Sequence, residues 1–153
     1  MTVWRLVRQR FARDAQSAFS GEGAALRGGR WNSRGVRLTY VSTSRALAVV
    51  ELLVHVDWSH VPTDLIFIGA ALPPDSIERL DRLPERWNAS PPLPTLGEVG
   101  DAFVQTGRAL ALLVPSAIVA GEHNVLLNPL HPSFNHIMFM QLEPSTLDRR
   151  LHR

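Results

Sequence analysis

The sequence predicts an α+β fold, in which a mixed central sheet is flanked by helices. Short apolar or alternating segments typical of strands are interspersed with segments of helical periodicity. These segments do not alternate as regular βαβ units, which disfavours a doubly wound fold. At 153 residues the chain suits a single compact domain over 1–153 and is too short for two comfortable ones.

Two strands and a helix are expected in the basic N-terminal third. Alternation of apolar and polar residues predicts strands over 3–7 and 36–41. A short helix is expected over 9–19. Glycines and few apolar residues then indicate a loop over 19–32.

The next helix is expected to carry a carboxylate among core residues. Thr43 or Ser44 can cap it, and it should reach about residue 55. Residues at helical spacing form its apolar face: Leu47, Val50, Glu51 and Val54. Because a buried carboxylate is costly unless it is paired or hydrogen-bonded, Glu51 needs a partner or a task. Arg30 is the nearest candidate in the sequence.

The remaining elements follow from apolar runs and turn residues. Further strands are predicted over 64–72, 109–114, 124–128 and 136–142. A short helix is expected over 75–83, and a proline-rich surface connection over 84–94. The capping-box pattern from Thr95 to Glu98 predicts a helix that reaches about residue 107.

Composition excludes several classes of chemistry. The chain has no cysteine, so disulfides, thiolate metal sites and cysteine nucleophiles are excluded. All 16 basic residues are arginine, which excludes a Walker-loop lysine and a Schiff base. The histidines lack metal-ligand spacing, so no metal is expected. No apolar run approaches the ~20 residues of a membrane helix, and we expect a cytoplasmic protein without a membrane partner.

The positive charge is concentrated at one end of the chain. Residues 1–45 hold nine arginines against Asp14 and Glu22, a net charge of +7, whereas residues 46–153 carry −5, and these sum to +2. This imbalance favours a local anion site or an acidic partner over direct nucleic-acid binding.

Two arginines are candidate anion ligands. Arg30 follows Gly28 and Gly29, which let a backbone approach a ligand closely, and its planar fork suits a phosphate or carboxylate. The alternative is a surface turn with a solvated arginine. Arg5, in the first strand, either faces inward or is likewise solvated.

Two hydroxyl side chains complete the candidate residues. Tyr40, the only tyrosine, ends a predicted strand and is either a ligand contact or a core tyrosine. Ser116 follows a strand, where loops often carry function. Its flanks do not form a Gly-x-Ser-x-Gly elbow, so a serine hydrolase is disfavoured, and Ser116 alone could be a turn residue.

Taken together, the motifs resemble those of the RES-domain family, the toxin half of a bacterial type II toxin–antitoxin pair. The similar blocks lie at Trp4-Arg5, 28–32, 38–42, 46–55, 113–119 and 122–132. By motif, the arginine, glutamate and serine that name the family match Arg30, Glu51 and Ser116, and Tyr40 matches a tyrosine of the same site. This chain has Ala120 where the family often carries proline, which removes no reacting group.

The resemblance implies an ADP-ribosyltransferase-like fold and an enzyme that consumes NAD. Its expected reaction is cleavage of the nicotinamide–ribose bond by hydrolysis or phosphorolysis, or ADP-ribosylation of a protein. Arg30, Tyr40, Glu51 and Ser116 are the expected catalytic residues. The residues expected to bind NAD are Arg5, Gly29, Trp31, Asn32 and Asn124. No cofactor beyond NAD as substrate is implied, with inorganic phosphate as a candidate co-substrate.

The resemblance also implies an Xre-type helix-turn-helix antitoxin that blocks the active site. Two alternatives of other classes stay open from the residues themselves. One is an RNA-cleaving toxin, although the sequence lacks a convincing histidine–glutamate constellation. The other is a non-catalytic module that binds an acidic partner through residues 1–45.

Overall fold

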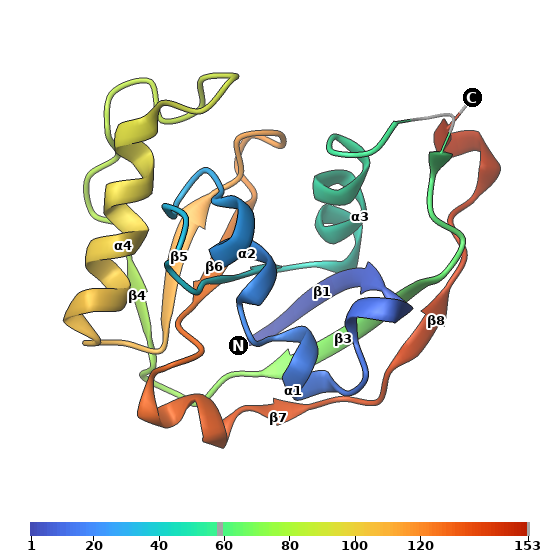
Figure 1. The fold of residues 1–153 in the computed structure, drawn as a ribbon, viewed down its shortest axis with the longest axis horizontal. Helices are drawn as coiled ribbons and strands as arrows, with labels where there is room; N and C mark the ends of the chain where they lie inside the picture. The colour runs from blue at the N-terminus through green and yellow to red at the C-terminus, as the bar shows by residue number, and fades with distance from the viewer. Residues whose placement is uncertain (58–59, 153) are drawn as a thin grey trace.

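One mixed sheet organises the computed structural model, which describes residues 1–57 and 60–152 (Figure 1). The strand order is β4-β5-β6-β2-β1-β3-β7, and β8 also pairs with β3. Only the β4–β5 pair is parallel among these strands. The strands are β1 (Thr2–Arg8), β2 (Thr39–Ser42), β3 (Leu65–Ala71), β4 (Ile77–Arg79), β5 (Ala111–Pro115), β6 (His123–Leu127), β7 (Met138–Phe139) and β8 (Glu143–Ser145). The predicted α+β fold with a mixed sheet is confirmed.

Few helices accompany the sheet, and two of them pack on one of its faces. The α-helices are α1 (Ala15–Ala18), α2 (Glu22–Arg27), α3 (Arg45–Leu53) and α4 (Gly97–Thr106). Short 3-10 turns lie at Gln9–Phe11, Pro94–Leu96, Pro132–His136 and Arg149–His152. In Figure 1, α3 lies beside β1, and α4 lies beside β4 and β5. No helix in the described part of the chain combines the length and apolarity needed to cross a membrane.

Successive side chains along the strands point to opposite faces of the sheet, and apolar residues on both faces form a core on each. One face buries Val41, Ile68 and Val125 around Phe19. The opposite face carries two clusters, because α3 and α4 cover different strands. The cluster under α4 consists mainly of Trp31, Leu38, Leu96, Phe103, Leu112, Val114 and Leu126. The cluster under α3 joins Ala48 to Leu6, Leu65 and Phe67 of β1 and β3.

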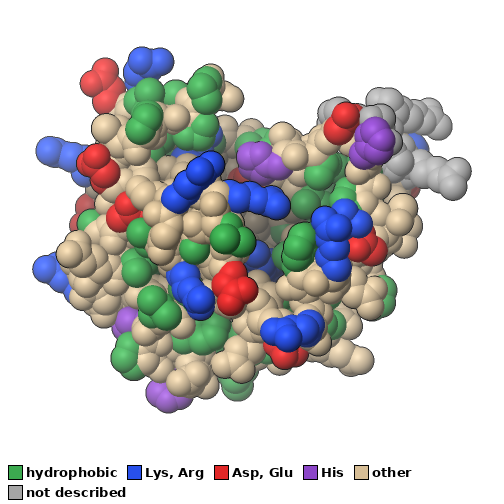
Figure 2. Space-filling view, viewed as in Figure 1, with side chains coloured by type: hydrophobic (Ala, Val, Ile, Leu, Met, Phe, Trp, Pro, Cys, Tyr) green, Lys and Arg blue, Asp and Glu red, His purple; other side chains and the backbone are tan. Residues whose placement is uncertain are grey.

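The sheet divides between β1 and β2. These strands share a single register pair, Trp4 with Ser42. By contrast, β1 pairs with β3 along its whole length, and β2 pairs with β6 from Thr39 to Ser42. The sheet therefore consists of a β4-β5-β6-β2 half and a β1-β3-β7-β8 half. Figure 2 shows the surface hollowed between α2 and α3, with basic side chains around the hollow.

The predicted helix over 75–83 is wrong, because this segment contains β4. Ile77 pairs with Ala111 and Arg79 with Leu113, in parallel with β5. The segment follows two prolines, and Asp75 adopts a positive φ of 57°. A strand of three residues has little periodicity of its own, so pairing with a distant strand decides its conformation.

The predictions for residues 9–32 also need correction. The expected helix over 9–19 is divided into a 3-10 turn and α1, because Asp14 caps a new helix by accepting from the Ser17 N–H. The expected loop over 19–32 contains α2. This helix begins after Gly21, whose left-handed φ of 71° replaces a side-chain cap.

Two helix and strand limits differ from the prediction as well. The capping box from Thr95 to Glu98 is not formed: α4 begins at Gly97, after a 3-10 turn, and no side chain caps it. The strand expected over 136–142 is only β7, since residues 132–136 form a 3-10 turn, and β8 follows separately. The remaining predicted strands and α3 agree with the structure within a few residues.

Candidate active site

Glu51 lies at the edge of the buried face of α3. Ser44 caps this helix by accepting a hydrogen bond from the Leu47 N–H, as predicted. The buried residues of the helix are Leu47, Ala48 and Leu53. Val54, which was expected to share the core face, is 51% exposed, and Glu51 itself is half-buried rather than enclosed. A side chain at this edge can keep protein partners and still meet a ligand.

Two neutral donors hold one oxygen of Glu51. The Ser116 hydroxyl donates to Oε1 at 2.8 Å, and the Asn124 side-chain amide donates to the same oxygen at 2.5 Å. From the residues that the structure describes, Oε2 receives no hydrogen bond. Arg30, the candidate partner nearest in the sequence, forms no ion pair with Glu51 within the described chain. The carboxylate is oriented by dipoles and keeps one oxygen available.

Ser116 is fixed as a donor by its own loop. This residue follows β5 and is only 3% exposed. Its Oγ accepts hydrogen bonds from the backbone N–H groups of Ile118 and Val119, each at 3.1 Å. Because both lone pairs are then used, the hydroxyl proton is left for Glu51.

Arg30 holds the proline-rich segment instead of the carboxylate. Its Nη1 donates to the backbone oxygens of Trp87 at 2.7 Å and Ala89 at 2.9 Å. Burial lowers the pKa of Arg30, whereas the negative charge of Glu51 opposes this shift. Arg30 therefore lies within electrostatic reach of Glu51 without contacting it, and it joins the glycine loop to residues 84–94.

Tyr40 supports the glycine loop from below. Its hydroxyl accepts from the Trp31 N–H at 3.0 Å and donates to the Asn32 Oδ1 at 2.7 Å. Burial is the main cause that raises the pKa of Tyr40. Gly29 is required here, because a Cβ at this position would lie 2.6 Å from the Tyr40 hydroxyl. The hydroxyl expected to meet a ligand is thus already engaged by the loop.

Trp31 and Asn32 face the interior. Trp31 is 3% exposed and belongs to the core under α4. The Asn32 side-chain amide donates to the backbone oxygens of Ala24, Ser33 and Val36. These two side chains, which were expected to bind NAD, therefore shape the loop in this structure.

Helix α4 also fixes the loop, through close backbone contact. A Cβ on Gly100 would lie 1.8 Å from the backbone oxygen of Trp31. Asp101, the next residue, accepts a hydrogen bond from the Ser33 N–H at 2.9 Å. Only glycine at position 100 allows the loop to lie this close to the helix.

Arg5 lies where β1 and β2 diverge. Its Nη1 donates to the backbone oxygen of Tyr40 at 2.7 Å and so reaches across to the other half of the sheet. Its Nε is buried and has no hydrogen-bond partner among the described residues. Burial lowers the pKa of Arg5 to about 10, so the group is still protonated at neutral pH. Arg5 is thus a half-buried cation with an enclosed Nε, suited to an anionic ligand.

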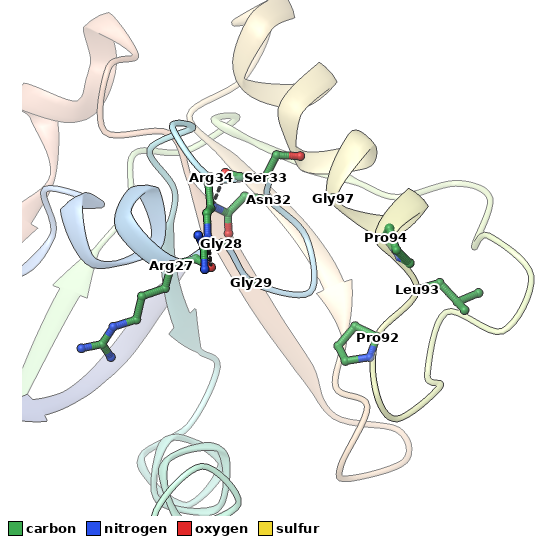
Figure 3. Close-up of a pocket in the computed structure, with 10 residues that line it drawn as sticks. All are labelled: Arg27, Gly28, Gly29, Asn32, Ser33, Arg34, Pro92, Leu93, Pro94 and Gly97. Atoms are coloured by element: carbon green, nitrogen blue, oxygen red, sulfur yellow. Dashed lines mark hydrogen bonds between the residues drawn. The ribbon is translucent and has the colours of Figure 1, made fainter.

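A pocket of about 330 Å³ borders the glycine loop (Figure 3). Gly28 and Gly29 line one side, and Pro92–Pro94 line the other. In Figure 3 the Arg27 side chain points away from the three residues at 92–94. The loop that carries Arg30 therefore has a second accessible surface beside the hollow near α3.

The arrangement brings together a carboxylate with one oxygen without a partner from the described residues and the two donors to its other oxygen, with Arg30 within electrostatic reach. Ser42 belongs to it, because its hydroxyl donates to the Asn124 Oδ1 at 2.8 Å. Sequence reasoning missed Ser42, and the available signal was its alternation with Tyr40 on one strand face. Between residues 1–57 and 60–152, no group of three His, Asp or Glu side chains is placed to hold a metal ion.

Comparisons with known proteins agree on one family. A protein named Toxin Res from Photorhabdus laumondii subsp. laumondii is 41% identical over 137 residues, covering 88% of this chain and 86% of the relative. The Prs ADP-ribosylating toxin of Sphingobium sp. (strain YBL2) is 33% identical over 157 residues, covering 99% and 97%.

A solved structure shares the fold. A chain of the M. tuberculosis MbcT–MbcA toxin–antitoxin complex superposes with a TM-score of 0.66 at 18% identity, covering 99% of this chain and 86% of that one. The family model described as the RES domain matches residues 2–148. With this match over nearly its whole length, the chain belongs to the RES domain family.

Proposed function

We propose that this protein is the toxin of a toxin–antitoxin pair and that it consumes NAD by cleaving the bond between nicotinamide and ribose. The observation that carries the proposal is the geometry of Glu51, whose Oε1 is held by Ser116 and Asn124 while Oε2 is left without a partner from the described residues. Two relatives over 30% identical and of similar length are named toxins.

A carboxylate beside the ribose favours this chemistry. When the C1′–N bond breaks, the electron pair leaves with nicotinamide, and positive charge develops on the ribose. A fixed carboxylate stabilises this charge, and Oε2 of Glu51 is the available atom. The acceptor oxygen of water or phosphate then forms the new bond to C1′ and loses its proton.

The arginines suit the other end of the substrate. Arg5 is a half-buried cation whose Nε has no partner among the described residues, and Arg30 retains donors beyond the Nη1 that holds Trp87 and Ala89. A diphosphate would supply the anionic partner that Arg5 does not have among the described residues. In this proposal both arginines bind the diphosphate, and Tyr40 acts by holding the loop.

Release of nicotinamide tests the proposal. The purified full chain is incubated with NAD, with and without inorganic phosphate, beside the Glu51→Gln variant. We expect wild type to release nicotinamide and Glu51→Gln to lose nearly all activity. Mass spectrometry of the other product distinguishes ADP-ribose from its phosphorylated form. Equal release by both proteins overturns the proposal, once intact-mass analysis has shown that no copurified partner is bound.

ADP-ribosylation of a protein is the second candidate, favoured by the name of the Sphingobium relative. The same cleavage would then transfer ADP-ribose to a side chain. Biotinylated NAD added to a bacterial lysate distinguishes the two, because only the transferase labels a protein band that disappears with Glu51→Gln.

The proposed partner is an Xre-type antitoxin that covers the cleft in the cytoplasm. The structural neighbour was solved as a toxin–antitoxin complex. Co-expression with the neighbouring gene should restore growth that the chain alone inhibits, and the complex should release no nicotinamide. If the chain does not affect growth, the toxin assignment fails.

A further inference from the structure

Ser42 and Asn124 form a cross-strand pair directly beneath Glu51. They are register partners on β2 and β6 and therefore lie on the same face of the sheet. The Ser42 hydroxyl donates to the Asn124 Oδ1 at 2.8 Å, and the Asn124 amide donates to the Glu51 Oε1 at 2.5 Å. Ser42 is 4% exposed, so solvent does not replace it readily.

In the series Ser42–Asn124–Glu51, each hydrogen bond is donated in the direction of the carboxylate. An amide has one donor end and one acceptor end, and an ionised Glu51 accepts only. With the amide nitrogen facing Glu51, the Asn124 oxygen must face Ser42, whose hydroxyl supplies the proton. Each bond therefore favours the orientation that the next one needs.

We propose that Ser42 and Asn124 are positioning residues for Glu51. Together with Ser116 they hold Oε1, which turns the carboxylate so that Oε2 stays available to the ribose. One N–H and the oxygen of Asn124 are engaged with protein groups, and in this proposal Asn124 acts through Glu51. This inference rests on the proposed function of the same site.

A merely structural role is the alternative, since any buried hydroxyl and amide must be satisfied. The two roles differ in what a substitution changes. A structural pair affects the free energy of unfolding, whereas a positioning pair lowers kcat and leaves KM nearly unchanged. Thr43 provides a matched control, because it directly follows β2 and its hydroxyl donates to the backbone oxygen of His123 in β6 instead of to the Glu51 network.

The experiment measures kcat and KM for nicotinamide release in Ser42→Ala, Asn124→Ala and the double variant. We expect Ser42→Ala to lower kcat about tenfold and to have little further effect in the Asn124→Ala background. Ser42→Thr keeps the hydroxyl and should restore most of the loss. Thr43→Ala should leave kcat unchanged. Equal losses from Ser42→Ala in both backgrounds, or an unchanged kcat, overturn the proposal.

A spectroscopic measurement separates this inference from the proposed function. In a wild-type protein with no NAD activity, the Asn124 side-chain NH₂ signal can still be followed by NMR. We expect Glu51→Gln to shift this signal and Ser42→Ala to accelerate its exchange with water. If Glu51→Gln leaves the signal unshifted and Ser42→Ala leaves its exchange rate unchanged, Ser42 and Asn124 do not position Glu51, whichever reaction the protein catalyses.

Discussion

Ser116 donates a hydrogen bond to Glu51 at 2.8 Å, although 65 residues separate them in the chain. A hydrogen bond to a charged group contributes about 1.5–3 kcal/mol, or roughly ten- to a hundredfold in rate if it acts in the transition state. We expect Ser116→Ala to lower kcat by this factor. The kcat of Ser116→Cys, whose thiol is a weak donor, should lie between those of wild type and Ser116→Ala. Steady-state assays below the melting temperature check this. A Ser116→Ala rate within twofold of wild type would contradict it.

Arg30 should control the mobility of residues 84–94. Arg30→Gln removes the guanidinium whose Nη1 donates to the backbone oxygens of both Trp87 and Ala89. We expect trypsin to cleave after the exposed Arg86 faster in this variant. Arg34→Ala is the control, because the one hydrogen bond that Arg34 donates to a described residue is long, at 3.4 Å, and lies outside this segment. Equal cleavage rates in the two variants would show that the hydrogen bonds from Arg30 do not restrain residues 84–94.

Gly100→Ala should destabilise the fold through overlap with the loop. The added Cβ would lie 1.8 Å from the Trp31 backbone oxygen, so the helix or the loop must move. We expect a loss of about 1–3 kcal/mol in urea unfolding. Gly23→Ala, also in a helix but with no atom within 4 Å of the new Cβ, should be neutral or stabilising by up to about 1 kcal/mol. Similar effects of both changes would show that the contact is not required.

Tyr40→Phe should weaken the loop rather than remove a reacting group. The Trp31 N–H and the Asn32 Oδ1 would both lose their partner. We expect a loss of about 1–3 kcal/mol in unfolding free energy together with a raised KM for NAD. Thr106→Ala, which removes an exposed hydroxyl from α4, should change stability by less than about 0.5 kcal/mol. An abolished kcat with unchanged stability would instead place the hydroxyl on the substrate.

The Arg45–Glu143 pair should stabilise the fold in a pH-dependent way. Arg45 donates to both carboxylate oxygens at 2.8 Å, and this bonding lowers the pKa of Glu143 from its ordinary 4.5. A carboxyl with a lowered folded-state pKa stabilises above its unfolded value and loses this effect as pH falls through the folded value. The stability difference between wild type and Glu143→Gln should therefore narrow below about pH 4.5.

The matched control for this pair is Glu85→Gln. Glu85 is exposed and has no hydrogen bond or ion pair within the described residues. Urea unfolding curves over a range of pH should show no comparable narrowing for this change. Parallel behaviour of Glu143→Gln and wild type at every pH would mean that the pair contributes nothing measurable.

Sequence reasoning located the elements whose stability is local. Strands β3, β5 and β6 carry continuous apolar runs, and α3 has both a serine cap and helical spacing. By contrast, β4 exists because it pairs with β5 more than thirty residues later. Helix α2 depends on a left-handed glycine without a side-chain cap, a signal that also predicts a turn.

The site was predictable as a set of residues but not as a set of contacts. Helical spacing drew attention to Glu51, and family resemblance added Arg30, Tyr40 and Ser116. The donors to Glu51 come from residues 65 and 73 positions away, and no local pattern encodes such a distance. Arg30, though nearest in sequence, turns instead to carbonyl groups 57 and 59 residues later.

The divided sheet gives the site a mechanical property. Helix α3 packs on Leu6 and Phe67 in the β1-β3 half, whereas Ser116 and Asn124 belong to the other half. The hydrogen bonds that orient Glu51 therefore cross the boundary between two halves of the sheet, whose strands β1 and β2 share one register pair. If the two halves moved slightly apart, the hydrogen bonds to the Glu51 Oε1 would be lost and the carboxylate would no longer be held in its orientation. A partner that binds between the two halves would thus inhibit this protein indirectly. A ligand that contacts both halves would instead keep the carboxylate oriented.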